Sequence, residues 1–101
     1  MGPSEVKRRV VFRGQAKADI IEALDWYRNS GVAPDFLRAF EATLNLIQQN
    51  PFQYQVIAGR IRRAPLQRFP YAIMYSATDE ELIILTCFHG RRDPKRWRDL
   101  T

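Results

Sequence analysis

The stretch that decides the fold is FPYAIMYSATDEELIILTCFHGRRDPKRWR, residues 69–98. In residues 71–76, tyrosine and isoleucine at the odd positions alternate with alanine, methionine and serine at the even positions, which is the period of two typical of a strand. Residues 82–88 form a second run that is rich in β-forming side chains. The polar residues 78–81 between these runs predict a β-hairpin. A basic segment that begins with His89, the one histidine of the chain, follows the second strand.

The second strand of this hairpin carries apolar side chains on both of its sides. Strict alternation places Ile83, Leu85 and Cys87 on one face, and the opposite face then receives Leu82, Ile84, Thr86 and Phe88. A strand that is apolar on both sides is typical of the interior of a sheet. We therefore expect helices over one of its faces and a different segment over the other.

Two helical patterns precede the hairpin. Residues 15–29 place apolar side chains on one stripe, at Ala16, Ile20, Ala23, Leu24 and Tyr27. Residues 34–49 do the same with Phe36, Leu37, Phe40, Leu44 and Ile47. The short connection over residues 30–33 predicts an antiparallel helical hairpin, whose joint apolar face needs a sheet to cover it.

The remaining segments predict short strands and a loop. Residues 10–12 form a candidate strand, and residues 52–59 are expected to be a loop anchored by Tyr54 and Val56. Residues 61–66 predict a further strand, which Pro65 places on an edge or at a bulge. A basic edge strand of this kind offers a partner a place to add its backbone or an apolar segment. The alternative is that the C-terminal segment folds back through Trp97 and Leu100 over the same sheet face.

Size and composition favour one compact domain over residues 1–101, with residues 1–8 flexible. No apolar run approaches the roughly 20 residues of a membrane helix, and the start lacks the pattern of a secretory signal. We therefore expect a soluble, cytoplasmic protein without membrane contact. Cys87 is the one cysteine, so an internal disulfide is excluded, and its apolar strand predicts a buried side chain.

Positive charge is concentrated in the second half of the chain. The net charge is +5, and residues 51–101 carry nine Lys/Arg against five Asp/Glu. One group of cations is Arg60, Arg62, Arg63 and Arg68, and a second is Arg91, Arg92, Lys95, Arg96 and Arg98. Such groups attract an acidic partner, either a protein or a nucleic acid, although a solvated basic rim is the alternative.

The order of these elements resembles the RelE/ParE superfamily of toxins from bacterial toxin-antitoxin modules, and within it the ParE branch. The resemblance runs from Arg9 to Trp97 and rests on an extended segment, two helices, and a meander that ends in FPY, an apolar strand, HGRRDP and RW. It implies an α+β fold in which a short N-terminal strand and an antiparallel helical hairpin pack on an antiparallel β-sheet, in the order β-α-α-β-β-β. It also allows a short C-terminal helix.

The resemblance implies a type II toxin that inhibits DNA gyrase by binding and is neutralised by a cognate antitoxin. Contact with DNA is expected only through the antitoxin, and no cofactor is expected. Our candidates for partner contact are the cations of both groups with the neighbouring ring residues, namely Arg60, Arg62, Arg63, Arg68, His89, Arg91, Arg92, Arg96 and Trp97.

The main alternative is an mRNA interferase of the RelE type, and a second is an antitoxin-binding module without toxicity. Cleavage needs a general base, a general acid and cations that hold the phosphate. Arginine stays protonated, so the proton chemistry would fall to His89, with Arg91 and Arg63 as phosphate ligands. A single histidine without further ligands at metal-binding spacing predicts no metal site.

Overall fold

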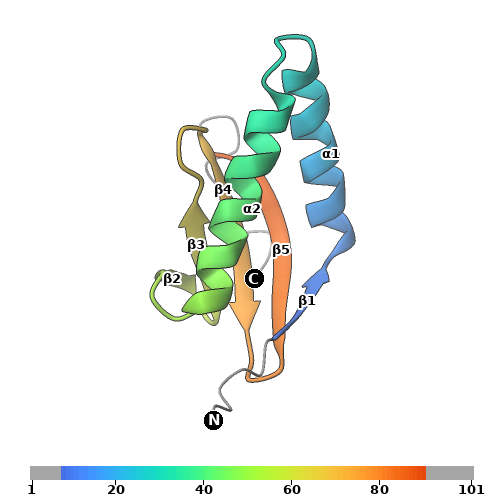
Figure 1. Cartoon of the computed structure of the whole chain (residues 1–101). Helices are drawn as coiled ribbons and strands as arrows, with labels where there is room; N and C mark the ends of the chain where they lie inside the picture. Colours follow the sequence, from blue (N-terminus) through green and yellow to red (C-terminus); the bar gives the residue numbers. More distant parts are fainter. Residues whose placement is uncertain (1–7, 91–101) are drawn as a thin grey trace.

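The structure, a computed structural model, describes residues 8–90. Its elements are, in chain order, β1 (Arg9–Phe12), α1 (Gly14–Arg28), α2 (Ala33–Gln49), β2 (Gln55–Ala58), β3 (Ile61–Pro65), β4 (Tyr71–Ala77) and β5 (Glu81–His89) (Figure 1). The predicted α+β fold is confirmed. The expectation of flexible residues 1–8 concerns, apart from Arg8, residues outside the described range, and so do the expectations for a C-terminal helix and for a cover through Trp97.

The strands form one sheet in the order β1-β5-β4-β3-β2. β5 has a neighbour on each side, which confirms the prediction that this strand is interior. Every pair is antiparallel except β1 with β5, which is parallel, with Val10 opposite Leu82 and Val11 opposite Ile83. β1 is followed by the helical hairpin and not by a β-turn. The sequence therefore contains no signal of whether β1 would pair parallel or antiparallel to its neighbour.

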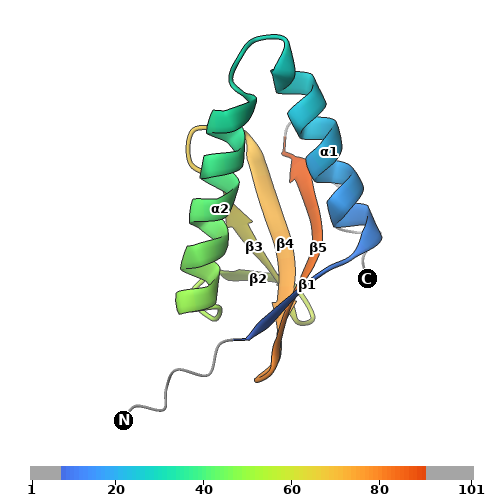
Figure 2. The same ribbon diagram turned by 45° about the vertical axis from the view of Figure 1, so that its right-hand side comes forward.

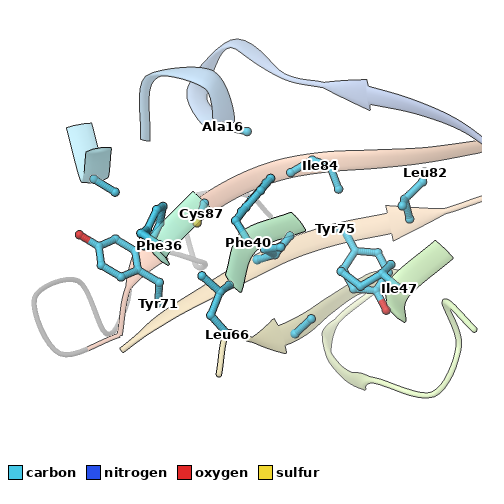
Figure 3. Close-up of a cluster of buried hydrophobic side chains, with 13 residues drawn as sticks. Ala16, Phe36, Phe40, Ile47, Leu66, Tyr71, Tyr75, Leu82, Ile84 and Cys87 are labelled. Carbon is cyan, nitrogen blue, oxygen red and sulfur yellow. The ribbon is translucent and has the colours of Figure 1, made fainter. Parts of the chain in front are cut away.

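Both helices pack on the same face of the sheet, antiparallel to one another (Figure 2). The chain reverses between them through Gly31, whose φ of 76° lies in the left-handed region that glycine adopts without strain. Their inward side chains meet those of β3, β4 and β5 in one core (Figure 3). Its buried members are Ala16, Ala23, Phe36, Phe40, Ile47, Ala64, Leu66, Tyr71, Ile73, Tyr75, Leu82, Ile84 and Cys87.

The predicted core stripes of the helices are confirmed with one exception. Leu37 is 39% exposed, and Thr43 is buried in the core face of α2 instead. The buried residues Phe36, Phe40, Thr43 and Ile47 recur every three or four positions. The prediction that Leu37 faces the core was wrong because Leu37 follows Phe36 directly and therefore points about 100° away from it around the helix.

A β-bulge in β5 changes which way its side chains point. Met74 is opposite Thr86 whereas Tyr75 is opposite Ile84, so Leu85 is the extra residue. Cys87 therefore joins Leu82 and Ile84 in the core beneath the helices. Strict alternation was wrong for the last part of this strand, although the expected burial of Cys87 is confirmed.

The carboxylate of Asp19 on α1 accepts hydrogen bonds from polar groups of β5 next to this bulge. Asp19 is 4% exposed, and its Oδ2 accepts hydrogen bonds from the Cys87 backbone N–H at 3.1 Å and from the Thr86 hydroxyl. Gln15 Nε2 donates to the other oxygen at 2.8 Å. A charged residue of α1 thus lies in the core where the sequence pattern placed only apolar side chains.

A second, smaller cluster lies on the other face of the sheet. It consists of Ile61, Ala72, Met74 and Phe88, with Ile57 and Leu85 packed against it. Ala72 and Met74 alternate along β4 with Tyr71, Ile73 and Tyr75, which belong to the core. The expectation that β5 is apolar on both sides is therefore confirmed.

The segment before β3 differs from its prediction. Residues 55–58, expected in a loop, form the edge strand β2, and Val56 is exposed and not an anchor. Tyr54 is an anchor, because its ring lies 6.3 Å from that of the buried Tyr75. Pro65 ends β3 beyond the residues that pair with β2, so its missing N–H costs no bond to that strand.

None of the helices within residues 8–90 is long and apolar enough to cross a membrane.

Replacing Thr86 with valine tests the link between Asp19 and the bulge. The valine keeps the shape of the side chain but removes a hydroxyl donor from a buried carboxylate, so we expect the free energy of unfolding to fall by about 1–3 kcal/mol. Chemical denaturation measures this loss. Thr86→Ser, which keeps the hydroxyl, is the control and should lose less. Equal stability of Thr86→Val and the unchanged chain would refute the assigned role of the bond.

Candidate functional site

The four arginines between residues 60 and 68 lie around β3 and not in one patch. Arg62 and Arg63 are neighbours on a strand, so their side chains leave it on opposite faces of the sheet. Arg60 precedes β3 in the turn from β2, and Arg68 follows the other end of β3. The cluster that is compact in sequence is therefore divided between two faces and two ends.

Arg62 lies on the helix side of the sheet and binds the segment that follows α2. Its Nη1 donates to the carbonyl oxygens of Phe52 at 3.1 Å and Tyr54 at 2.7 Å. Its guanidinium carbon lies 5.2 Å from the centroid of the Phe52 ring. Arg62 therefore holds residues 52–54 against β3, and only its remaining N–H groups are available to a partner.

Tyr75 of β4 also holds this segment against the sheet. The Tyr75 hydroxyl donates to the carbonyl oxygen of Pro51 at 2.6 Å, and the side chain is fully buried. Burial raises the pKa of Tyr75 to about 12, with a smaller upward contribution from Tyr54, although the charge of Arg62 acts in the opposite direction. The phenol thus remains a hydrogen-bond donor throughout the neutral range.

Arg63 lies on the other face and reaches the end of β5. It is opposite Met74, a member of the second cluster. A Cβ added at Gly90 would lie 3.9 Å from Arg63 Nη2 and 3.7 Å from the carbonyl oxygen of Pro70, which accepts the Gly90 N–H at 2.8 Å. The guanidinium of Arg63 therefore reaches the end of β5.

The side chain of His89 leaves β5 on the face of the sheet that the helices cover. It is opposite Tyr71, and the two rings meet edge to face with their centroids 5.1 Å apart. Tyr71 in turn packs against Tyr27 and Phe36 in the core. The imidazole of His89 and the guanidinium of Arg63 therefore start from opposite faces of the sheet.

Arg60 and Arg68 are exposed and each lines a cavity. Arg68 has a φ of 72°, which is uncommon for a residue other than glycine, and borders a cavity of about 240 Å³ beside α2 that includes Ala39 and Leu46. Arg60 borders a cavity of about 300 Å³ with Phe52 and Arg62. The candidates Arg91, Arg92, Arg96 and Trp97 lie outside the described residues.

Sequence reasoning missed the exposed ring of Phe52 and its neighbour Arg8. Phe52 is 53% exposed, and the guanidinium carbon of Arg8 lies 5.5 Å from its ring centroid. Arg8 also donates from Nε to the carbonyl oxygen of Thr78. No local pattern links residues 8 and 52, so this contact has no signal in the sequence.

No group of three or more His, Cys, Asp or Glu within residues 8–90 is arranged to hold a metal ion.

The chain matches the family described as ParE toxin of type II toxin-antitoxin system, parDE, over residues 10–94. Comparison with curated proteins gives no significant match.

Solved structures from toxin-antitoxin systems have a similar fold. A chain of the chromosomal ParDE system from P. aeruginosa has a TM-score of 0.70 and 18% identity, over 81% of this chain and 95% of that one. A chain of the E. coli DinJ-YafQ toxin-antitoxin complex has a TM-score of 0.64 and 15% identity, over 84% of this chain and 94% of that one. At these identities the likeness concerns the fold alone.

The raised pKa of Tyr75 predicts a loss of stability at high pH. Above its ordinary pKa of 10 the phenol ionises in the unfolded chain, whereas the folded chain keeps the proton up to about pH 12. The stabilisation is therefore complete below pH 10 and declines between pH 10 and 12. Chemical denaturation at pH 9 and pH 11.5 should show a larger loss for the unchanged chain than for Tyr75→Phe. An identical loss in the two proteins would contradict this origin.

Proposed function

Because the chain belongs to the family of ParE toxins of type II toxin-antitoxin systems, we propose that it inhibits DNA gyrase by binding and is neutralised by a cognate antitoxin. In this proposal the chain reaches operator DNA only through the antitoxin. The chemistry of the site favours a surface that grips a partner over one that cleaves a substrate.

The observation that carries the proposal is the placement of His89 relative to Arg63. A nuclease needs its base and its phosphate-binding cation within hydrogen-bond reach of one phosphodiester. In the part of the chain that the structure describes, the His89 imidazole packs against Tyr71 on the helix side, whereas Arg63 projects from the other face. These two side chains leave the sheet from opposite faces, which supports a binding role over a shared cleavage site.

The other arginines support a binding role in different ways. Arg62 donates hydrogen bonds to two backbone carbonyls, so its main role is to stabilise the fold. Arg60 and Arg68 are exposed at opposite ends of β3 and provide positive charge on two separate surfaces. Two basic surfaces suit a protein that has both a target and a neutralising partner.

The proposal is tested by adding the purified chain to a gyrase supercoiling reaction and, separately, to ribosomes that translate a defined message. We expect inhibition of supercoiling, reversal of that inhibition by the antitoxin encoded beside this chain, and no site-specific cleavage of the message. His89→Ala should inhibit gyrase within about twofold of the unchanged chain, since inhibition by binding uses no proton transfer and most interface residues contribute little when truncated to alanine.

Two results would overturn the proposal. Message cleavage that disappears in His89→Ala would establish the interferase alternative. Normal growth on induction without antitoxin, together with unimpaired supercoiling, would identify an antitoxin-binding module without toxicity.

A further inference from the structure

A cavity at the edge of the sheet combines exposed apolar and basic groups. Its volume is about 300 Å³, and its lining, which we call the Phe52 surface, consists of Phe52, Val56, Gly59, Arg60, Arg62 and Ala77. These residues come from the segment that follows α2, the β2–β3 hairpin and the end of β4. The surface is therefore assembled from segments that the fold brings together.

The apolar part of this surface is unusually exposed. Phe52 is 53% exposed and Val56 is 45% exposed, and both line the same cavity. Neighbouring exposed apolar side chains around a hollow mark binding sites more often than solvated surface. Val56 belongs to β2, the terminal strand of the sheet, whose outer edge can bind the backbone of another chain.

The polar part of this surface carries positive charge alone. Within residues 8–90, Arg60 and Arg62 line the cavity, and no carboxylate does. Arg62 is held by the carbonyl oxygens of Phe52 and Tyr54, and Arg60 is exposed. A carboxylate brought to Arg60 would gain a charge-assisted hydrogen bond beside an apolar wall that excludes water.

These features fit a protein segment that carries one carboxylate better than a nucleic acid. The guanidinium groups of Arg8 and Arg62 already lie over the Phe52 ring, at 5.5 and 5.2 Å from its centroid, and therefore compete with a base for the space in which it would stack. The acidic turn at Asp79 and Glu80 follows closely after Ala77 and would repel a continuous phosphate backbone. A peptide with one carboxylate at Arg60 brings less negative charge past this turn than a phosphate backbone does, so the repulsion is smaller.

We propose that the cognate antitoxin binds the Phe52 surface through a segment that places an aliphatic or aromatic side chain in the cavity and one carboxylate against Arg60. The inference rests on the proposed function, because it names the chemistry by which the antitoxin recognises this chain. It assigns the exposed Arg60 to the neutralising partner and leaves Arg68, at the far end of β3, to other contacts.

The test is titration calorimetry of the full chain with the antitoxin encoded beside it. Phe52→Ala and Arg60→Glu should each weaken binding at least tenfold, and Arg60→Glu should also flatten the dependence of the dissociation constant on salt. Matched controls lie on α1, where Ile21→Ala removes an apolar side chain that is 61% exposed and Lys17→Glu makes the same change of charge at an exposed position. Both controls should bind within about threefold of the unchanged chain.

Thermal unfolding of each variant verifies the fold, and Arg60→Glu, at an exposed turn, keeps the test valid if Phe52→Ala is unstable. Tight binding of the antitoxin by both variants would overturn the inference and leave the proposed function intact. Failure of the antitoxin to bind the unchanged chain would overturn both. Binding of a labelled oligo(dT) strand that is lost in Phe52→Ala and Arg60→Glu would also overturn the inference, because it would assign the surface to nucleic acid.

Discussion

The fold depends on the buried carboxylate of Asp19, which joins α1 to the interior strand β5. An extra residue interrupts the ladder between β4 and β5, and a bulge of this kind leaves backbone groups in need of new partners. Asp19 accepts the Cys87 N–H and the Thr86 hydroxyl, so α1 completes the hydrogen bonding of the strand beneath it. This bond fixes the position of α1 along β5 and allows the strand to change face. The placement of His89 on the helix side follows from that change.

Periodicity predicted the elements well because each is governed by local physics. The helix stripes, the hairpin around Thr78 and the burial of Cys87 follow from spacing and residue type, and the Thr78 hydroxyl accepts the N–H groups of Glu80 and Glu81 as a turn residue does. The bulge and the burial of Asp19 did not follow. Each depends on the other across 67 residues or more, and neither has a local signal.

The candidate site was only partly predictable, because charged residues that are adjacent in the sequence of a strand point to opposite faces of the sheet. Arg62 and Arg63 are adjacent in sequence, yet one binds the carbonyls of Phe52 and Tyr54 and the other approaches Gly90 across the opposite face. A count of arginines gives the sign of the partner's charge and says nothing of which side receives it. That information comes from the register of β3 with β4.

The anchoring of residues 51–54 explains how an exposed aromatic ring can serve recognition. Pro51 accepts the hydroxyl of buried Tyr75, and the carbonyls of Phe52 and Tyr54 accept Arg62, so successive parts of this segment are bonded to the sheet. The backbone of this segment has therefore already lost conformational freedom on folding, and the Phe52 ring lies against the guanidinium groups of Arg8 and Arg62. A partner that covers it then loses little further entropy, which is the condition under which a small apolar contact contributes strongly to affinity. In the binding proposed for the Phe52 surface, the buried Tyr75 therefore acts through Phe52 alone, whereas Arg62 both holds this segment and lines the cavity.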